Sequence, residues 1–434
     1  MKKIYTIFFA SCLAVAAIAQ NLEIAGSTNA VGGVSCFYYD AIDNLTYVVG
    51  SLSSADGNPM KGAAAWNGSS WTAIGDPSAL GSITAMNDIV RCNDTLWTIG
   101  IGVTIDGSYP GRILAYWDGA AWVSSGYGIF GNSHYLAVLN NRLWVAGNIS
   151  GGMPVDSTIS AYESLGKMAY WNGHKLVADA NYNSMFDSPN DIIEYNGKLY
   201  ANERVYDGNT WSDWSIDLVN GSAEIKKMFV HKGKLYVSIE HSTNNYILQY
   251  DGSTIDTVAN NIDHNVTDMA SMGDNLVACG NFNSFDGGTF EEVAVWDGNT
   301  WTGIDDLLGG NVNTLGNYNG QLLLSTIEGH PIYSDATQSN VGSVATFGDP
   351  LPTSVVSVSR REGMVYPNPS NGTFTLTGIS EKTEVRVFNV LGEEVSRKII
   401  SGQDMIQLGD VPAGMYTLRL QSQDGLRIEN IVVQ

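Results

Sequence analysis

Apolar residues in this chain alternate with polar ones or run in blocks of four to five, and no segment shows convincing helical spacing. Two examples are HKGKLYVSI (231–239) and MGDNLVACG (272–280), in which a polar turn leads directly into an apolar stretch. Alternation of this kind places side chains on the two faces of a strand, and Asn, Asp and Gly favour a tight reversal before it. The pattern therefore predicts an all-β protein built from short strands.

The turn followed by an apolar strand recurs seven times. Aligned on one leucine of the strand, the units start about 46 residues apart on average. The aligned leucines are Leu45, Leu96, Leu143, Leu199, Leu235, Leu276 and Leu322. A strand-rich repeat with a period in the forties is typical of a β-propeller. We expect residues 20–348 to form a propeller of about seven blades, with six or eight as alternatives because the fourth and seventh units diverge.

A second motif, an aromatic residue followed by Asn-Gly or Asp-Gly, follows the first in six of the units. Its aromatic and glycine positions are Trp66 and Gly68, Trp117 and Gly119, Trp171 and Gly173, Tyr206 and Gly208, Tyr250 and Gly252, and Trp296 and Gly298. Each unit is therefore expected to contain four strands. Two flank the turn of the first motif, one ends at the aromatic residue of the second motif, and one follows that motif. We expect the aromatic side chains to fill space between neighbouring blades, a role that explains their repetition. The alternative is stacking on sugar rings.

The repeat units resemble kelch-type and related bacterial propeller repeats, including the phrase GNFNSFDG (280–287). The paired glycines of a typical kelch repeat are not consistent in this chain. The resemblance implies a propeller scaffold and leaves the ligand open.

A different module follows a linker at 349–362. Residues 363–434 carry prolines, an Asn-Gly turn and alternating segments such as VRVFNV (385–390), which predict a small β-sandwich. Three runs occur in order: Tyr366-Pro367-Asn368-Pro369 with Gly372, then VFNVLG ending at Gly392, then PAGMY with Gly414 and Tyr416. They closely resemble the type A C-terminal sorting domain of type IX secretion substrates. The resemblance implies recognition by the type IX machinery, then release of the cargo or attachment to surface lipopolysaccharide.

The first 19 residues predict a signal peptide. Lys2 and Lys3 precede the apolar run IFFASCLAVAAI (7–18), and a small-x-small site ends at Ala19, so the mature chain is expected to start at Gln20. We therefore expect Sec export to the periplasm, followed by type IX secretion to the outer cell surface or the medium.

The charge of the chain argues against a nucleic-acid partner, and the spacing of its cysteines argues against a zinc site. The chain has 44 acidic and 22 basic residues, and the acidic excess lies in the propeller region. Such a surface repels nucleic acid, so no nucleic-acid partner is expected. Cys36, Cys92 and Cys279 fit no zinc spacing and are expected to be small buried side chains.

The residues indicate no catalytic set, metal site or cofactor site. The histidines are scattered, and no GxSxG motif or P-loop occurs. Many carboxylates are present, but a sequence cannot place two of them across a pocket as a glycosidase requires. The preferred hypothesis is a non-catalytic extracellular binding or adhesion protein with a glycan or protein ligand. The alternatives are a carbohydrate-active hydrolase or lyase on the same scaffold, and a structural surface component.

Overall fold

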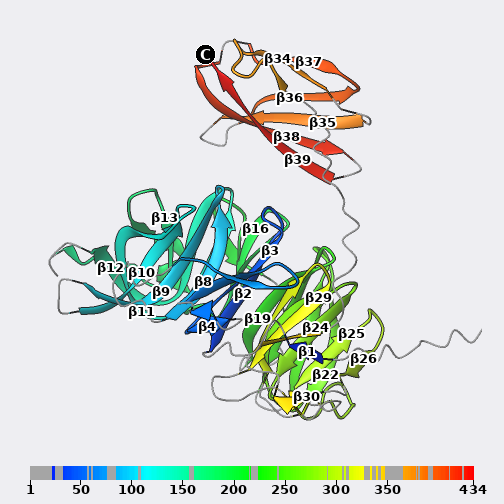
Figure 1. Cartoon of the computed structure of the whole chain (residues 1–434). Helices are drawn as coiled ribbons and strands as arrows, with labels where there is room; N and C mark the ends of the chain where they lie inside the picture. Colours follow the sequence, from blue (N-terminus) through cyan, green and yellow to red (C-terminus); the bar gives the residue numbers. More distant parts are fainter. Residues whose placement is uncertain are drawn as a thin grey trace, which may run out of the picture.

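The computed structural model is built almost wholly of β-strands (Figure 1). The residues that it describes are 22–24, 33–55, 58–59, 62–75, 85–105, 109–155, 161–214, 216, 223–241, 244–290, 292–304, 307–308, 312–326, 333–334, 339–340, 344–347, 365–377, 379, 382–389, 394–409, 411–422 and 425–434. The predicted signal peptide, its cleavage site at Ala19 and Gln20, the predicted linker and Gly392 lie outside these ranges.

Four of the propeller sheets are four-stranded antiparallel meanders, each in chain order from the inner strand outward. The first contains β2 (Val34–Asp40), β3 (Leu45–Gly50), β6 (Ala63–Trp66) and β7 (Trp71–Ala73). The others contain β15 (Ile192–Tyr195), β16 (Lys198–Ala201), β17 (Arg204–Tyr206) and β18 (Trp211–Asp213); β19 (Glu224–His231), β20 (Lys234–Glu240), β21 (Asn245–Tyr250) and β22 (Ile255–Ile262); and β23 (Val266–Met272), β24 (Asn275–Gly280), β25 (Val293–Trp296) and β26 (Trp301–Gly303). This is the four-strand unit that the two sequence motifs predict.

The second and third repeat units form one seven-stranded sheet instead of two separate ones. Its strands are β8 (Ala85–Cys92), β9 (Thr95–Ile105), β10 (Tyr109–Trp117), β11 (Trp122–Leu139), β12 (Arg142–Pro154), β13 (Met168–Trp171) and β14 (Leu176–Ala178). Strand β11 joins them because it pairs with β10 from Trp122 to Ile129 and with β12 from Tyr127 to Leu139. Register shifts at Phe130/Gly131 and Asn132/His134 mark the irregular region between its two halves.

The last propeller sheet is completed by the other end of the chain. Its strands are β28 (Val312–Tyr318), β29 (Gln321–Thr326), β32 (Val344–Phe347) and β1 (Leu22–Ile24). Strand β1 pairs with β32, with Leu22 opposite Phe347. The sequence analysis did not predict this pairing, because a contact between chain ends leaves no local signal.

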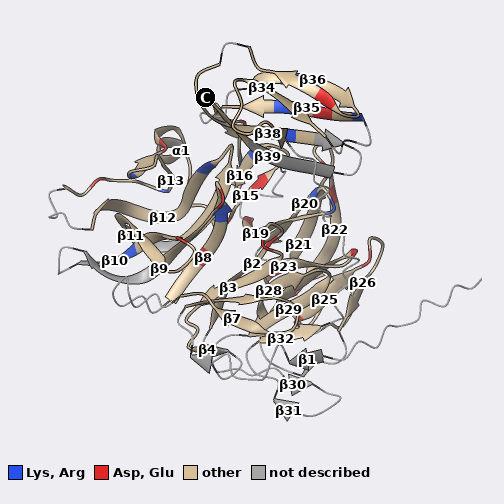
Figure 2. Ribbon diagram, turned by 45° about the horizontal axis from the view of Figure 1, so that its top comes forward, with Lys and Arg blue, Asp and Glu red and all other residues tan. Residues whose placement is uncertain are grey.

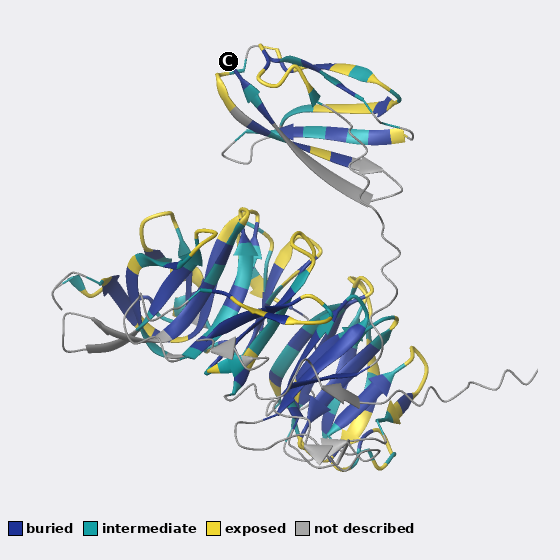
Figure 3. Ribbon diagram, viewed as in Figure 1, coloured by how far each residue is buried: buried dark blue, intermediate teal, exposed yellow. Residues whose placement is uncertain are grey.

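Hydrophobic cores lie between successive sheets, and the series closes on itself. One core joins the sheets of β20 and β24 through side chains such as Tyr236 and Leu276. Another joins the first and last sheets through Val48, Tyr318 and Leu323. Buried residues accordingly run along the strands and exposed ones gather in the turns (Figure 3). The sheets stand around a common centre, toward which the inner strands turn (Figure 2), so the arrangement is that of a propeller.

Five short strands and one short helix lie in the connections between these strands. They are β4 (Ser54–Ala55), β5 (Asn58–Pro59), β27 (Leu307–Leu308), β30 (Tyr333–Ser334), β31 (Ser339–Asn340) and the six-residue helix α1 (Ala180–Met185). The Asp179 side chain caps α1 by accepting from Tyr182 N.

The C-terminal residues form two sheets over one core. One sheet contains β33 (Val365–Tyr366), β34 (Thr373–Leu376) and β37 (Asp404–Gln407), and the other contains β36 (Glu394–Ser401), β35 (Lys382–Phe388), β38 (Gly414–Ser422) and β39 (Gly425–Val433). Phe374 from the first sheet and Leu418 from the second belong to the same buried cluster. The two sheets therefore bury their apolar faces against each other.

The two sequence motifs fold into different turns. The first motif gives two-residue hairpins, as at Asn196-Gly197, where both residues have positive φ (51° and 75°). The aromatic motif gives a four-residue loop, which differs from the tight hairpin that the sequence predicts. At Asp118 the side-chain Oδ1 accepts from Ala120 N (2.8 Å) and Ala121 N (2.7 Å), and Gly119 takes φ 98°. The carboxylate thus stabilises the longer loop.

Candidate functional site

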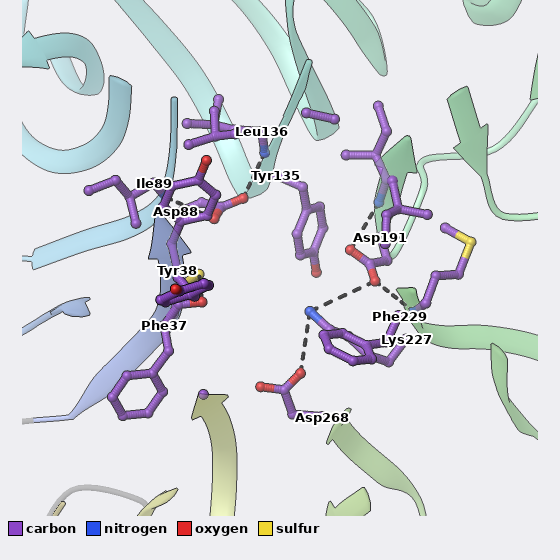
Figure 4. Close-up of a pocket in the computed structure, with 18 of the residues that line it drawn as sticks. Phe37, Tyr38, Asp88, Ile89, Tyr135, Leu136, Asp191, Lys227, Phe229 and Asp268 are labelled. Atoms are coloured by element: carbon purple, nitrogen blue, oxygen red, sulfur yellow. Dashed lines mark hydrogen bonds and ion pairs between the residues drawn. The ribbon is translucent and has the colours of Figure 1, made fainter. Parts of the chain in front are cut away.

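A cavity of about 550 Å³ lies at the centre of the propeller (Figure 4). In the described part of the chain, seven strands contribute to its lining, namely β2, β8, β11, β15, β19, β23 and β28 or the residues beside them. Because these are the innermost strands of all the repeat units, the cavity is built by the whole propeller and is a natural place for a ligand.

One residue in each repeat unit occupies an equivalent position on the inner strand, and all of these except Thr314 line the cavity. Each lies four residues before the last residue of its inner strand. These ring positions are Cys36, Asp88, Tyr135, Asp191, Lys227, Asp268 and Thr314. A register shift immediately precedes several of them, for example between Met86 and Asp88 and between Val266 and Asp268. Such bulges redirect side chains and occur often near functional sites.

The three ring aspartates hold the backbone in the same way. Asp88 accepts from Ile89 N of its own strand (2.8 Å) and from Leu136 N of the next repeat unit (2.7 Å). Asp191 repeats this with Ile192 N (2.9 Å) and Met228 N (2.8 Å), and Asp268 with Met269 N and Leu315 N (both 2.9 Å). Each carboxylate therefore satisfies two amides and ties one repeat unit to the next.

Lys227 occupies the ring position between Asp191 and Asp268. Its Nζ lies 3.8 Å from Asp191 Oδ2 and 3.5 Å from Asp268 Oδ1. Burial alone lowers the pKa of the Lys227 ammonium, but attraction to Asp191 and Asp268 outweighs it, and the pKa lies well above its usual value. Burial raises the pKa of Asp191, which the Lys227 charge opposes. On this side of the ring, one ammonium group therefore lies between two carboxylates.

The side of the ring around Asp88 lacks such an ion pair. In the described ranges, no Lys, Arg or His nitrogen forms an ion pair with the Asp88 carboxylate. Burial raises the pKa of Asp88 to about 6, although the hydrogen bond from Leu136 N, the neighbouring Cys36 thiol and the more distant Lys227 charge all lower it. The Cys36 thiol itself donates to Phe37 O (3.4 Å). Burial also raises the pKa of Cys36 well above its usual value, so this thiol stays protonated. Tyr135 directs its hydroxyl into the cavity between the two sides (Figure 4).

The predicted aromatic turn residues lie away from this cavity. Their rings pair across the loop, as with Trp117 and Trp122 (5.5 Å between centroids) and Trp296 and Trp301 (5.3 Å). The Trp122 Nε1–H donates to Ile74 O (2.8 Å) and the Trp301 Nε1–H to Val258 O (2.7 Å), in each case in the preceding repeat unit. Trp66 donates to Gln321 (3.2 Å) and is 3% exposed. These contacts join neighbouring sheets, which fits the architectural interpretation of the repeat.

Equivalent turns elsewhere keep the same geometry with fewer aromatic pairs. Trp171 pairs with Leu176 and Tyr250 with Ile255 across their loops, while Tyr206 pairs with Trp211 (5.1 Å). The glycines Gly68, Gly173, Gly208, Gly252 and Gly298 all have φ between 94° and 103°. The sequence analysis picked out these residues and missed the ring positions. Reading eight residues before each aligned leucine, or nine in the first unit, would have found them.

The predicted sorting-motif residues gather near one end of the C-terminal sheets. Asn368 Oδ1 accepts from Val432 N (2.9 Å), the buried Tyr416 donates its hydroxyl to Pro412 O (2.7 Å), and Gly372 has φ 87°. Tyr366 is exposed, and Pro367, Pro369 and Gly414 lie in the same segments. The motif residues therefore shape loops that join the strands.

The histidine and cysteine side chains of the described residues form no metal-binding cluster. His134 and His231 are buried, and Cys36, Cys92 and Cys279 are free thiols. Among the described residues, no three His, Cys, Asp or Glu side chains gather as metal ligands would.

Comparison with protein families finds a match for the C-terminal residues of the chain. Residues 364–434 match the secretion system C-terminal sorting domain. The sorting domain indicates that the chain is a substrate of type IX secretion, that it interacts with the type IX machinery, and that it is exported to the cell surface or the medium. Within the described ranges, no helix has the length and apolar character needed to cross a bilayer.

Comparison with solved structures finds similar chains at low sequence identity. The extracellular domain of the hybrid two-component system BT4673 from B. thetaiotaomicron is 13% identical with a TM-score of 0.50, over 88% of this chain and 47% of that one. PorZ, a surface component of the type IX secretion system of Porphyromonas gingivalis, is 14% identical with a TM-score of 0.38, over 90% and 64%. The β-propeller domain of the Trilobed protease from Pyrococcus furiosus is 10% identical with a TM-score of 0.33, over 75% and 95%.

The chain thus spans about half to two thirds of the length of the first two of these proteins. No curated protein matches it. The likeness concerns the fold, and an all-β chain with propeller-type neighbours is what it supports.

Proposed function

We propose that this chain is a type IX secretion substrate whose propeller acts outside the cell as a non-catalytic binding module, with its ligand in the central cavity. The sorting domain supports the route of export. The cavity supports the location of binding, because residues from all the inner strands meet there.

The observation that carries the non-catalytic assignment is the engagement of the ring carboxylates. Asp88, Asp191 and Asp268 each accept one amide from their own unit and one from the next. These contacts fix the position of each carboxylate between two repeat units, and each oxygen keeps a second lone pair with which to hold a bound ligand. Carboxylates that hold the sheets together are better suited to shaping a site than to attacking a bound ligand.

The finer architecture belongs to the same proposal. We place a signal peptide at 1–19, a seven-bladed kelch-like propeller at 20–348, a linker at 349–362 and a C-terminal β-sandwich at 363–434. The seven ring positions and the closed series of inter-sheet cores support seven blades. After removal of the sorting domain, the propeller is released or attached to surface lipopolysaccharide.

A carbohydrate-active hydrolase or lyase is the second candidate, and one observation favours it. The pKa of Asp88 is raised to about 6, so this carboxyl is partly protonated near neutral pH and has the character of a general acid. A partner carboxylate with an ordinary pKa would then be required across the cavity.

A glycan array with product analysis separates these functions. The mature full chain and its Asp88→Asn variant are applied to the same array, and bound and released sugars are analysed. A binding module retains unchanged glycans in the wild type. An enzyme releases shortened or unsaturated products that the Asp88→Asn variant does not form, and this outcome would reject the non-catalytic proposal.

A further inference from the structure

We infer that the Asp88 side of the central cavity binds a small ligand through a primary ammonium group. This inference rests on the binding function proposed above and names the chemistry of the ligand. The groups that carry it are Asp88, Asn87 and Tyr135, all of which line the cavity.

The ring already accommodates one ammonium group. Lys227 Nζ lies 3.5 Å from Asp268 and 3.8 Å from Asp191, while both carboxylates keep their two backbone hydrogen bonds. A ring aspartate can therefore hold its amides and attract an ammonium at the same time, because each carboxylate oxygen has two lone pairs. The contact of Lys227 with Asp191 and Asp268 is thus an example, within this chain, of an ammonium group held by ring aspartates.

Asp88 presents the same carboxylate without the ammonium. Its oxygens accept from Ile89 N and Leu136 N, as the other two aspartates do with their own partners. The ring positions beside it hold Cys36 and Tyr135, which bring no positive charge. A bound cation would therefore pair with Asp88 as Lys227 pairs with Asp191 and Asp268.

A second polar group on this side lacks a partner. Asn87 Oδ1 is buried and accepts no hydrogen bond, although Asn87 lines the cavity. A buried carbonyl oxygen left without a donor costs free energy. An ammonium group has three N–H donors, so it can donate to Asp88 and to other acceptors of the cavity lining, such as the Tyr135 hydroxyl, at the same time.

The charges around the cavity favour a cation. The lining includes the carboxylates of Asp88, Asp191, Glu194 and Asp268 and the cations Lys227 and Arg91. Arg91 is engaged by Asp40 and Asp43, so it does not compensate Asp88. Tyr38 also lines the cavity and offers an aromatic surface, which stabilises cations.

Calorimetric titration of the mature full chain tests the inference. The probes are 1,4-diaminobutane and, as the neutral control of the same length, 1,4-butanediol. Nα-acetyl-lysine amide represents an ammonium supplied by a peptide. We expect saturable binding of at least one amine at pH 7.5 and none of the diol. If the lysine amide binds more tightly than the diamine, the natural source is a peptide side chain, and the reverse order indicates a free amine.

Three variants locate the site. Asp88→Asn should weaken amine binding at least tenfold. Asn87→Ala keeps the amide contacts of Asp88 and should weaken binding several-fold, which covers the case in which Asp88→Asn does not fold. Asp256→Asn removes an exposed carboxylate on β22 and should change affinity less than twofold.

Equal binding of the diol, or unchanged amine affinity in both cavity variants, would overturn the inference. If no amine binds while the array retains a neutral glycan, the ammonium chemistry is wrong and the binding function stands. If neither binds, both fail.

Discussion

The two sides of the central ring use one backbone arrangement in two electrostatic settings. Asp268 and Asp88 each accept one amide from their own repeat unit and one from the next. Asp268 also has the Lys227 ammonium at 3.5 Å, whereas Asp88 has Cys36 and Tyr135 as ring neighbours. Repetition fixes the position of the carboxylate, and the neighbouring units decide its charge state.

This difference distinguishes the residues of a repeat unit that stabilise the fold from those that we expect to bind a ligand. Contacts that recur in several units, such as the aspartate bridges and the tryptophan contacts to the preceding sheet, hold the propeller together. Features that occur in one unit, such as the uncompensated Asp88, have no such explanation. They are where we expect the propeller to carry its specific activity.

The largest expected effect is the loss of Lys227. Lys227→Met leaves Asp191 and Asp268 without a cation, and their side chains are only 8% and 12% exposed. Removing one partner of a largely buried pair is costly, so we expect a loss of about 3 kcal/mol in the free energy of unfolding. Urea unfolding at pH 7.5 measures it. A loss below about 1 kcal/mol would mean that the ring charges are screened by water.

Neutralising one aspartate on each side compares them directly. Asp268→Asn removes a carboxylate that compensates Lys227, and we expect a loss of about 2 kcal/mol. Asp88→Asn also places an NH₂ group against a backbone amide but relieves an uncompensated charge, and we expect about 1 kcal/mol. Urea unfolding of the two variants in parallel gives the order. The reverse order would show that the sides do not differ as described.

Asp88 should make its own contribution to the pH dependence of stability. The pKa of Asp88 is about 6 in the folded chain against 3.8 for an unperturbed aspartate. The folded chain therefore binds more protons between these values, and its free energy of unfolding falls as the pH rises through this interval. Relative to Asp88→Asn, the wild type should be more stable at pH 4.5 than at pH 7.5. A difference between the two proteins that does not change with pH would contradict the prediction.

The smallest effect should come from Cys36→Ser. The Cys36 thiol donates to Phe37 O and lies near Asp88. A hydroxyl is a stronger hydrogen-bond donor, so a serine that donates to Asp88 should stabilise the ionised carboxylate and lower the pKa of Asp88 from about 6. A carboxyl ¹³C titration by NMR, with Asp88→Asn to assign the signal, measures this value. An unchanged or higher pKa would show that Cys36 does not interact with Asp88.

The sequence predicted the local features of the fold and little of the site. The leucine alignment located the second strands, and the Asp-Gly and Asn-Gly pairs located the turns, because both depend on residues close in the chain. The pairing of β1 with β32 and the fusion of two units through β11 depend on long-range contacts and were missed. The meeting of Asp88 with Cys36, and of Lys227 with Asp191 and Asp268, arises from the packing of successive repeat units around the centre, which local patterning does not encode.

Structure determination of the mature protein crystallised with 1,4-diaminobutane tests the central claim most directly. The account predicts an amine nitrogen within hydrogen-bonding distance of the Asp88 carboxylate and Asn87 Oδ1, with Lys227 still between Asp191 and Asp268. A cavity in which Asp88 is instead paired with a group of the protein, or an amine bound elsewhere on the chain with the Asp88 side empty, would contradict it.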